Sequence, residues 1–369
     1  MNTYPSFTDS HTLFNKLMER YQPPPNFVSS DENLVNITKK RVATLMLQWV
    51  TRDVDLLDTI LIQKITNFAE VKLPQDKLES IGQRICQQLK KAESAKNSSS
   101  NYKPPEIIIY NLPQISVSKL FFSAHPVDIA EQLTLLDLEI FSRIELSELI
   151  GQRWVKESTQ ILSSNVVQLI CKVNRLAFWV GTMILLQVKV ADRVDAIKFF
   201  VSVAQNLFQK NNFNSLLGIL AGLNLASITR LQITLNNLPK KTTELMEYLF
   251  TIQDPSSSFK HLREAKKKAG FNAVPYLGLN LQDLTRIDEG NATELIVSGL
   301  NLINFPKFSL NETATSDLLI HQKAIDNFKI SKLEPLFTFL GELPALTEKE
   351  LHSMSLEREP KGCTAKDVI

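Results

Sequence analysis

Two adjacent acidic residues, Asp288 and Glu289, lie where the sequence predicts the end of a helix. Apolar residues precede them at spacings of four, three and three, the pattern of one helix face: Leu277, Leu281, Leu284 and Ile287. Gly290 indicates the stop, because glycine accepts the left-handed conformation that closes a helix. The last turn carries the negative end of the helix dipole, so carboxylates there are locally unfavourable. The pair indicates either a functional carboxylate that offers charge and hydrogen-bond acceptors, or a solvated acidic turn.

The common patterns of covalent and nucleotide chemistry are missing from the sequence. Nothing matches Gly-x-x-x-x-Gly-Lys followed by Ser or Thr, so the chain is not expected to bind nucleotide directly. No Gly-x-Ser-x-Gly nucleophile elbow occurs. Neither the scattered histidines nor the distant cysteines make a metal-spaced set, so we expect no metal site: His11, His125, His261, His321, His352, Cys86, Cys171 and Cys363. We therefore expect a binding protein without a cofactor, and not an enzyme.

Composition narrows the choice of partner and compartment. The 369 residues are 44% hydrophobic and 22% charged, with a formal net charge of +2. A protein that neutralises many phosphates needs a strong basic excess, so a nucleic-acid partner is not expected. The longest apolar run, Leu176 to Leu186, is too short for a transmembrane helix. The cysteine pattern and the lack of a secretory signal predict a cytoplasmic, reducing setting.

Apolar residues at helical spacing recur along most of the chain, so the predicted fold class is all-α. A polar stretch at 91–106, rich in Lys, Ser and Asn, cannot bury enough apolar surface to order itself and is predicted to be a linker. It separates a small helical module at 1–90 from a larger domain at 107–369. In the module, a helix from Leu34 to Val50 is expected to carry one apolar face. In the domain, a short β-branched run at 107–109 favours an extended segment.

Two helices of the larger domain have clear local signals. One carries apolar residues at spacings of three and four, with Trp179 on a neighbouring face, and is predicted to be central: Ile170, Val173, Ala177, Val180 and Ile184. Asn211 and Asn212 precede a second apolar helix that runs through Leu216 and Leu223. Asparagine is a favoured N-cap, so these side chains are predicted to be structural.

The run from Val274 to Asn291 reads Val-Pro-Tyr-Leu-Gly-x-x-Leu-x-Asp-Leu-Thr-x-Ile-Asp-Glu-Gly-Asn. It resembles the motif of the catalytic domain of Ras-type guanine-nucleotide exchange factors, where it forms the first arm of a protruding helical hairpin. Further blocks similar to the family occur in the family's order, three before this run and one after it, at 128–154, 221–231, 254–263 and 339–357. The resemblance covers about 122–360. Residues from Tyr4 to about Leu73 are similar to the family's N-terminal exchanger-motif module, which this resemblance implies is truncated.

The resemblance implies that the protein promotes GDP release from a Ras-family small GTPase. The hairpin would push aside the first switch of the GTPase, while a helical bowl grips the second. Glu289 would contact the P-loop groups that normally serve phosphate and Mg²⁺, and Thr285, four residues earlier on the same face, would crowd the metal position. Further GTPase contacts are implied for Thr134, Asn224, Phe259, Tyr276 and Asn291.

The sequence departs from the family pattern after Phe305, where the residues from Pro306 to Asn311 replace the usual basic run. Proline cannot donate a backbone hydrogen bond inside a helix, so we expect the second helix to begin late, near Ser316. A degenerate hairpin leaves open a non-catalytic protein that binds or scaffolds a small GTPase. A purely structural helical protein is the third alternative.

Overall fold

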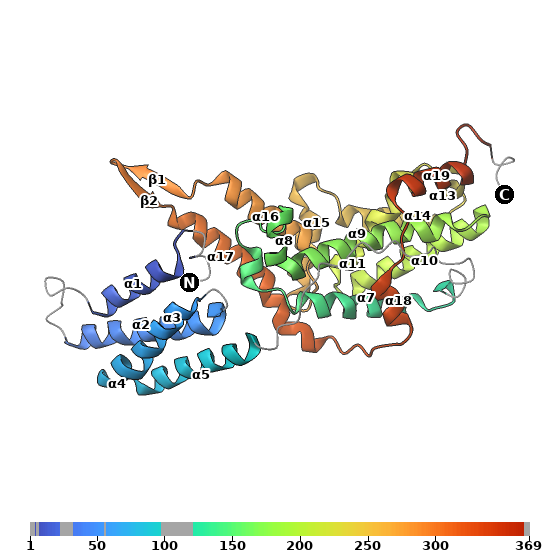
Figure 1. Cartoon of the computed structure of the whole chain (residues 1–369). Coiled ribbons are helices and arrows are strands. Elements are labelled where there is room, and N and C mark those ends of the chain that lie inside the picture. The colour runs from blue at the N-terminus through green and yellow to red at the C-terminus, as the bar shows by residue number, and fades with distance from the viewer. Residues whose placement is uncertain (1–3, 5–6, 23–31, 55–56, 97–120, 365–369) are drawn as a thin grey trace. The chain divides into compact units, whose positions relative to one another are not determined.

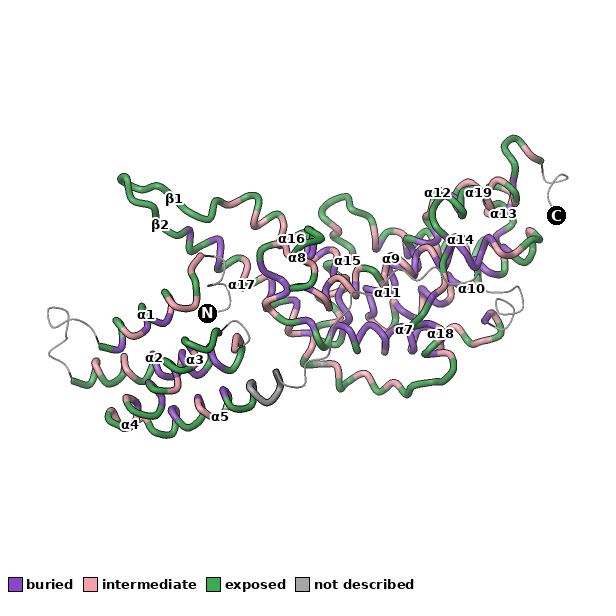
Figure 2. Tube along the Cα trace, viewed as in Figure 1, coloured by how far each residue is buried: buried purple, intermediate pink, exposed green. Residues whose placement is uncertain are grey.

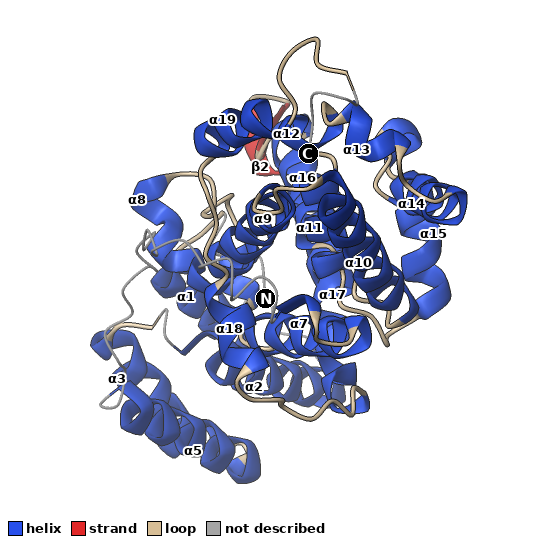
Figure 3. Ribbon diagram, turned by 90° about the vertical axis from the view of Figure 1, so that its right-hand side faces the viewer, coloured by secondary structure: helices blue, strands red, loops and turns tan. Residues whose placement is uncertain are grey.

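The computed structural model describes residues 4, 7–22, 32–54, 57–96 and 121–364. Within these ranges the regular secondary structure is helical apart from one two-stranded sheet, which confirms the all-α prediction (Figures 1 and 3). Two compact units are present: residues 1–103 with 290–312, and residues 104–289 with 313–369. Helix α5 extends to Lys96, into the stretch assigned to the linker. The run at 107–109 lies outside the described residues.

The first unit contains the N-terminal helices and one β-hairpin. Its elements are α1 (Ser10–Tyr21), α2 (Glu32–Asp53), α3 (Thr59–Asn67), the π-helix η4 (Phe68–Lys72), α4 (Leu73–Gln75), α5 (Glu79–Lys96), β1 (Glu294–Val297) and β2 (Leu300–Ile303). The strands pair antiparallel from Glu294 opposite Ile303 to Val297 opposite Leu300. The turn between them, Ser298-Gly299, has φ of 53° and 78°, the left-handed region that tight hairpin turns require.

The core of the first unit forms around Trp49 on α2, whose side chain is fully buried. Tyr4 contacts it edge-on, with ring centroids 5.6 Å apart. A second aromatic pair belongs to the same unit: Phe7 and Phe308 lie 4.7 Å apart, and Phe308 is buried. The predicted apolar face of α2 is only partly correct, because its start, including Leu34, is exposed.

The second unit is built from packed helices. They are α7 (Pro126–Phe141), η5 (Leu146–Leu149), α8 (Glu157–Gln160), η6 (Ile161–Ser163), α9 (Ser164–Leu185), α10 (Val190–Gln209), α11 (Phe213–Leu223), α12 (Ala226–Thr229), α13 (Gln232–Asn236), α14 (Lys240–Ile252), η7 (Ser256–Ser258), α15 (Lys260–Ala269), α16 (Leu277–Gly290), η8 (Ile320–Asn327), α18 (Leu336–Glu342) and α19 (Glu348–Arg358). Helix α17 (Phe305–Leu319) begins in the first unit and ends in the second.

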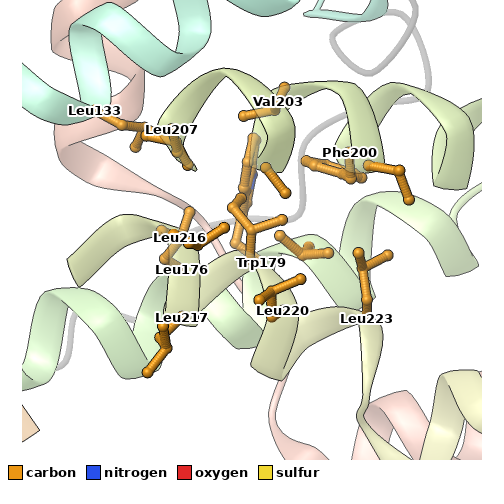
Figure 4. Close-up of a cluster of buried hydrophobic side chains, with 14 of the residues drawn as sticks. Leu133, Leu176, Trp179, Phe200, Val203, Leu207, Leu216, Leu217, Leu220 and Leu223 are labelled. Carbon is orange, nitrogen blue, oxygen red and sulfur yellow. The ribbon is translucent and has the colours of Figure 1, made fainter. Parts of the chain in front are cut away.

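Helix α9 is central to the second unit, as predicted, and Figure 2 shows the buried residues gathered along α7, α9 and α11. Trp179 is fully buried among side chains from α7, α10 and α11 (Figure 4). Gly222 lets α11 approach α9 closely, since a Cβ at this position would lie 2.6 Å from the carbonyl oxygen of Ala177. Asn212 caps α11 as predicted: its side-chain oxygen accepts a hydrogen bond from the Ser215 amide at 3.0 Å.

The helix predicted to form the second arm of the helical hairpin starts earlier than expected. Helix α17 begins at Phe305, so the expected start near Ser316 is wrong. Pro306 is the second helical residue, and proline is tolerated in a first turn because its missing N–H has no partner there. Asn304 precedes the helix; its side chain donates to the Ala292 carbonyl at 2.8 Å, and its carbonyl accepts from the Lys307 amide at 3.1 Å.

Candidate functional site

Helix α16 buries one face and leaves the other open. Leu277, Leu281 and Leu284 are buried in one cluster that also contains Leu318 from the end of α17. Thr285 is half-buried and Glu289 is exposed. The helix ends at Gly290, as the sequence predicts, but Gly290 does not adopt the left-handed conformation that was expected to close it. The buried leucines therefore fix the helix, while the carboxylate of Glu289 stays accessible to a partner.

Glu289 has no partner among the residues that the structure describes, whereas its neighbour Asp288 does interact within the chain. A carboxylate near the negative end of a helix dipole gains nothing from the helix itself. It is therefore available to accept hydrogen bonds from another molecule. Thr285 lies four residues earlier, which places the two side chains on neighbouring turns of one helix face.

The segment before α16 is anchored to the start of α11. The Val274 amide donates to the Asn211 carbonyl at 3.0 Å, and the Phe213 amide donates to the Val274 carbonyl at 2.9 Å. Tyr276 follows; it is half-buried, and burial raises the pKa of its phenol. Its ring lies over Gly278, where a Cβ would stand 2.5 Å from the phenol oxygen. A glycine at this position is what allows the ring to lie there.

We expect Gly278→Ala to move the Tyr276 ring. The added methyl group cannot share space with the ring, and rotating a half-buried tyrosine away is easier than unwinding the helix. Binding to a partner that touches Tyr276 should weaken by about tenfold, while the free energy of unfolding changes by less than about 1 kcal/mol. Titration calorimetry would measure the partner affinity of wild type and of Gly278→Ala, and urea unfolding would measure their free energies of unfolding. Equal partner affinity would show that the ring position does not matter.

The other predicted contact residues differ in exposure. Asn224 is exposed directly after α11, and Phe259 and Asn291 are half-buried. Thr134 is fully buried: its hydroxyl donates to the Ala130 carbonyl at 2.7 Å and accepts from the Asn212 side chain at 3.0 Å. Thr134 is therefore part of the interior here, and the expectation that its side chain lines a surface does not match its position.

Thr134 borders a buried polar cluster that the sequence did not reveal. Asp137 on α7 is fully buried and pairs with Lys172 on α9, with Oδ1 2.6 Å from Nζ. Its carboxylate also accepts from Asn212 at 2.9 Å, from Asn214 at 3.1 Å and from the hydroxyl of Ser215. The cluster joins α7, α9 and α11. The Asp137 carboxylate is paired on both oxygens, so the cluster serves the fold, although the side-chain oxygen of Asn214 has no hydrogen-bond partner among the described residues.

The described ranges contain neither a cluster of metal ligands nor a helix that could span a membrane. No three His, Cys, Asp or Glu side chains there are grouped so that they could hold a metal ion. No helix in the same residues is both long and apolar enough to cross a membrane.

These features define a helical protein with an accessible carboxylate on a firmly packed helix. The family described as RasGEF domain matches residues 128–309, and the RasGEF N-terminal motif matches residues 1–68. The chain belongs to the Ras guanine-nucleotide exchange factor family, which confirms the resemblance.

Among similar proteins are three Ras guanine nucleotide exchange factors of Dictyostelium discoideum. Factor R is 34% identical over 364 residues, covering 97% of this chain and 20% of its own length. Factor S is 32% identical over 98% of this chain and 35% of its own length. Factor A is 30% identical over 100% of this chain and 62% of its own length. The chain thus spans only part of each of these relatives.

Proposed function

We propose that the protein is a guanine-nucleotide exchange factor that promotes GDP release from a Ras-family small GTPase. Family membership supports exchange on a Ras-type GTPase. The observation that carries the proposal is the exposed, unpaired Glu289 at the end of α16, a helix whose opposite face is buried. An accessible carboxylate on a fixed helix is suited to replace an anionic ligand of the GTPase.

Exchange needs no covalent chemistry. A GTPase holds its nucleotide through P-loop contacts to phosphate and Mg²⁺, so release is slow until those contacts are lost. A partner shifts this equilibrium only by its differential affinity for the nucleotide-free and loaded states. Glu289 would accept hydrogen bonds from the P-loop donors that lose their phosphate acceptor when the nucleotide leaves. Thr285 would occupy space near the metal position. Both contacts exist only when nucleotide and metal have moved.

The remaining contacts would hold the GTPase during exchange. Tyr276, Asn224, Phe259 and Asn291 are all at least partly accessible and would face the second switch or its surroundings. Contacts of this kind are made to loaded and nucleotide-free GTPase alike. They would set affinity, while Glu289 and Thr285 would set the rate of release.

Stopped-flow release of a fluorescent guanine nucleotide from Ras, Rap and Ral proteins tests the proposal. At least one GTPase should release nucleotide faster in proportion to added protein, with saturation at high concentration. Tight binding to a nucleotide-free GTPase without faster release would instead favour the scaffold function. If the protein neither bound any GTPase of the panel nor speeded nucleotide release from it, both functions would be overturned for these GTPase classes.

A further inference from the structure

Three consecutive residues before α15 have left-handed backbone conformations. Ser257, Ser258 and Phe259 have φ of 53°, 56° and 59°. None of them is glycine, so each is disfavoured by contact between its Cβ and the backbone. Such a run persists only where surrounding contacts hold it, and strain of this kind is concentrated at functional sites. The run ends on Phe259, one of the residues proposed to contact the GTPase.

Side chains fix the turn from both of its ends. On the N-terminal side, the Asp254 carboxylate accepts from the Ser256 amide at 2.9 Å and from the Ser256 hydroxyl at 2.6 Å. On the C-terminal side, Nε of Arg263 donates to the Ser258 carbonyl at 2.9 Å. This carbonyl belongs to the middle residue of the left-handed run. The Arg263 bond is therefore a direct restraint on the strained conformation.

The same guanidinium reaches the helix that carries Glu289. Nη2 of Arg263 donates to Oδ1 of Asp283 at 2.8 Å, and Asp283 lies on α16, two residues before Thr285 and three before Arg286. Arg286 approaches the same Asp283 oxygen only to 3.8 Å. The Arg263 side chain thus connects the turn that carries Phe259 to the helix that carries Thr285 and Glu289.

We propose that Arg263 is a positioning residue of the exchange site, which holds Phe259 at a fixed place relative to α16. The inference rests on the proposed function, since it assigns Phe259 and Glu289 to one interface. Arginine suits this task because its planar fork donates in two directions at once, whereas lysine offers a single point charge. Without the Nε bond, the strained turn is free to relax and to carry Phe259 away from its place.

The test is nucleotide release measured at several concentrations of the full chain carrying Arg263→Gln or Arg263→Lys. A misplaced Phe259 weakens a contact made to loaded and nucleotide-free GTPase alike, so the half-saturating concentration should rise while the maximal rate stays within about twofold. Losing an exposed ion pair of this kind should raise the half-saturating concentration of Arg263→Gln by up to about fivefold. Lysine should fall between glutamine and wild type. A purely structural defect would instead lower the melting temperature and the maximal rate.

Lys260→Gln is the matched control, because Lys260 is an exposed cation in the same helix without a bond to the turn or to α16. Asp283→Asn combined with Arg263→Gln should be no worse than Arg263→Gln alone, since one link has been removed twice. If Arg263→Gln behaves like Lys260→Gln, or if the double variant is clearly worse than Arg263→Gln alone, Arg263 is not the link.

Hydrogen exchange separates this inference from the proposed function. In Arg263→Gln, the amides of residues 256–260 should exchange faster than in wild type, whether or not any GTPase responds. Wild type that releases no nucleotide, together with faster exchange in the variant, would overturn the proposed function and with it the role of Arg263 at that site. Active wild type with unchanged amide exchange in the variant would overturn the inference alone.

Discussion

Glu289→Ala should slow GTPase nucleotide release by about ten- to a hundredfold at saturating protein. A hydrogen bond to a charged group contributes roughly 1.5–3 kcal/mol, and this one is proposed to form only once nucleotide has left. The loss should therefore appear in the maximal rate and not in the half-saturating concentration. Since the side chain is exposed, the free energy of unfolding should change by less than about 0.5 kcal/mol.

Two further variants sharpen this result. Glu289→Gln keeps the shape and one acceptor but removes the charge, so its rate should lie between wild type and alanine. Glu247→Ala removes an exposed glutamate from α14 and should leave the rate unchanged. A Glu289→Ala protein with full exchange activity and an unaltered melting temperature would contradict the assigned role of the carboxylate, and the scaffold function would then be preferred.

Asp137→Ala should have the largest effect on stability. It leaves the ammonium of Lys172, whose side chain is only 10% exposed, without its carboxylate, and it leaves donors of Asn212 and Ser215 without their acceptor. Removing one partner of a buried ion pair costs about 3–5 kcal/mol. Urea unfolding followed by far-ultraviolet circular dichroism would measure the loss.

Two further variants serve as controls for Asp137→Ala. Asp195→Ala breaks an exposed pair with Lys198 on α10 and should cost less than about 0.5 kcal/mol. Adding Lys172→Met to Asp137→Ala should recover part of the lost stability, because the unpaired charge is gone. If Asp137→Ala were as stable as Asp195→Ala, the buried cluster would not be a main support of the fold.

The features that the sequence predicted correctly are local. The end of α16 at Gly290, the Asn212 cap and the central position of α9 all follow from residues within a few turns. The start of α17 was missed because Pro306 has opposite meanings in a helix interior and in a first turn. The β-hairpin was missed because its two strands are only four residues each.

Other features were beyond a local pattern. Asp137 meets Asn212, Asn214 and Ser215 across separations of 75 to 78 residues, so only the folded chain brings them together. The same packing buries Thr134, a residue whose type suits a surface equally well. The left-handed run at 257–259 contains no glycine or asparagine, the residues that would have signalled it.

The Phe7–Phe308 pair has a consequence for how the protein is made. The first unit joins residues 1–103 with 290–312, so its parts leave the ribosome far apart in time, with all of 104–289 synthesised in between. Domains generally fold as units during synthesis, N-terminal ones first. Here the N-terminal helices emerge early, but the contact between Phe7 and Phe308 can form only after residue 308 has been synthesised. A nascent chain stalled before residue 290 should therefore hold an incomplete first unit, with Phe7 lacking its contact to Phe308.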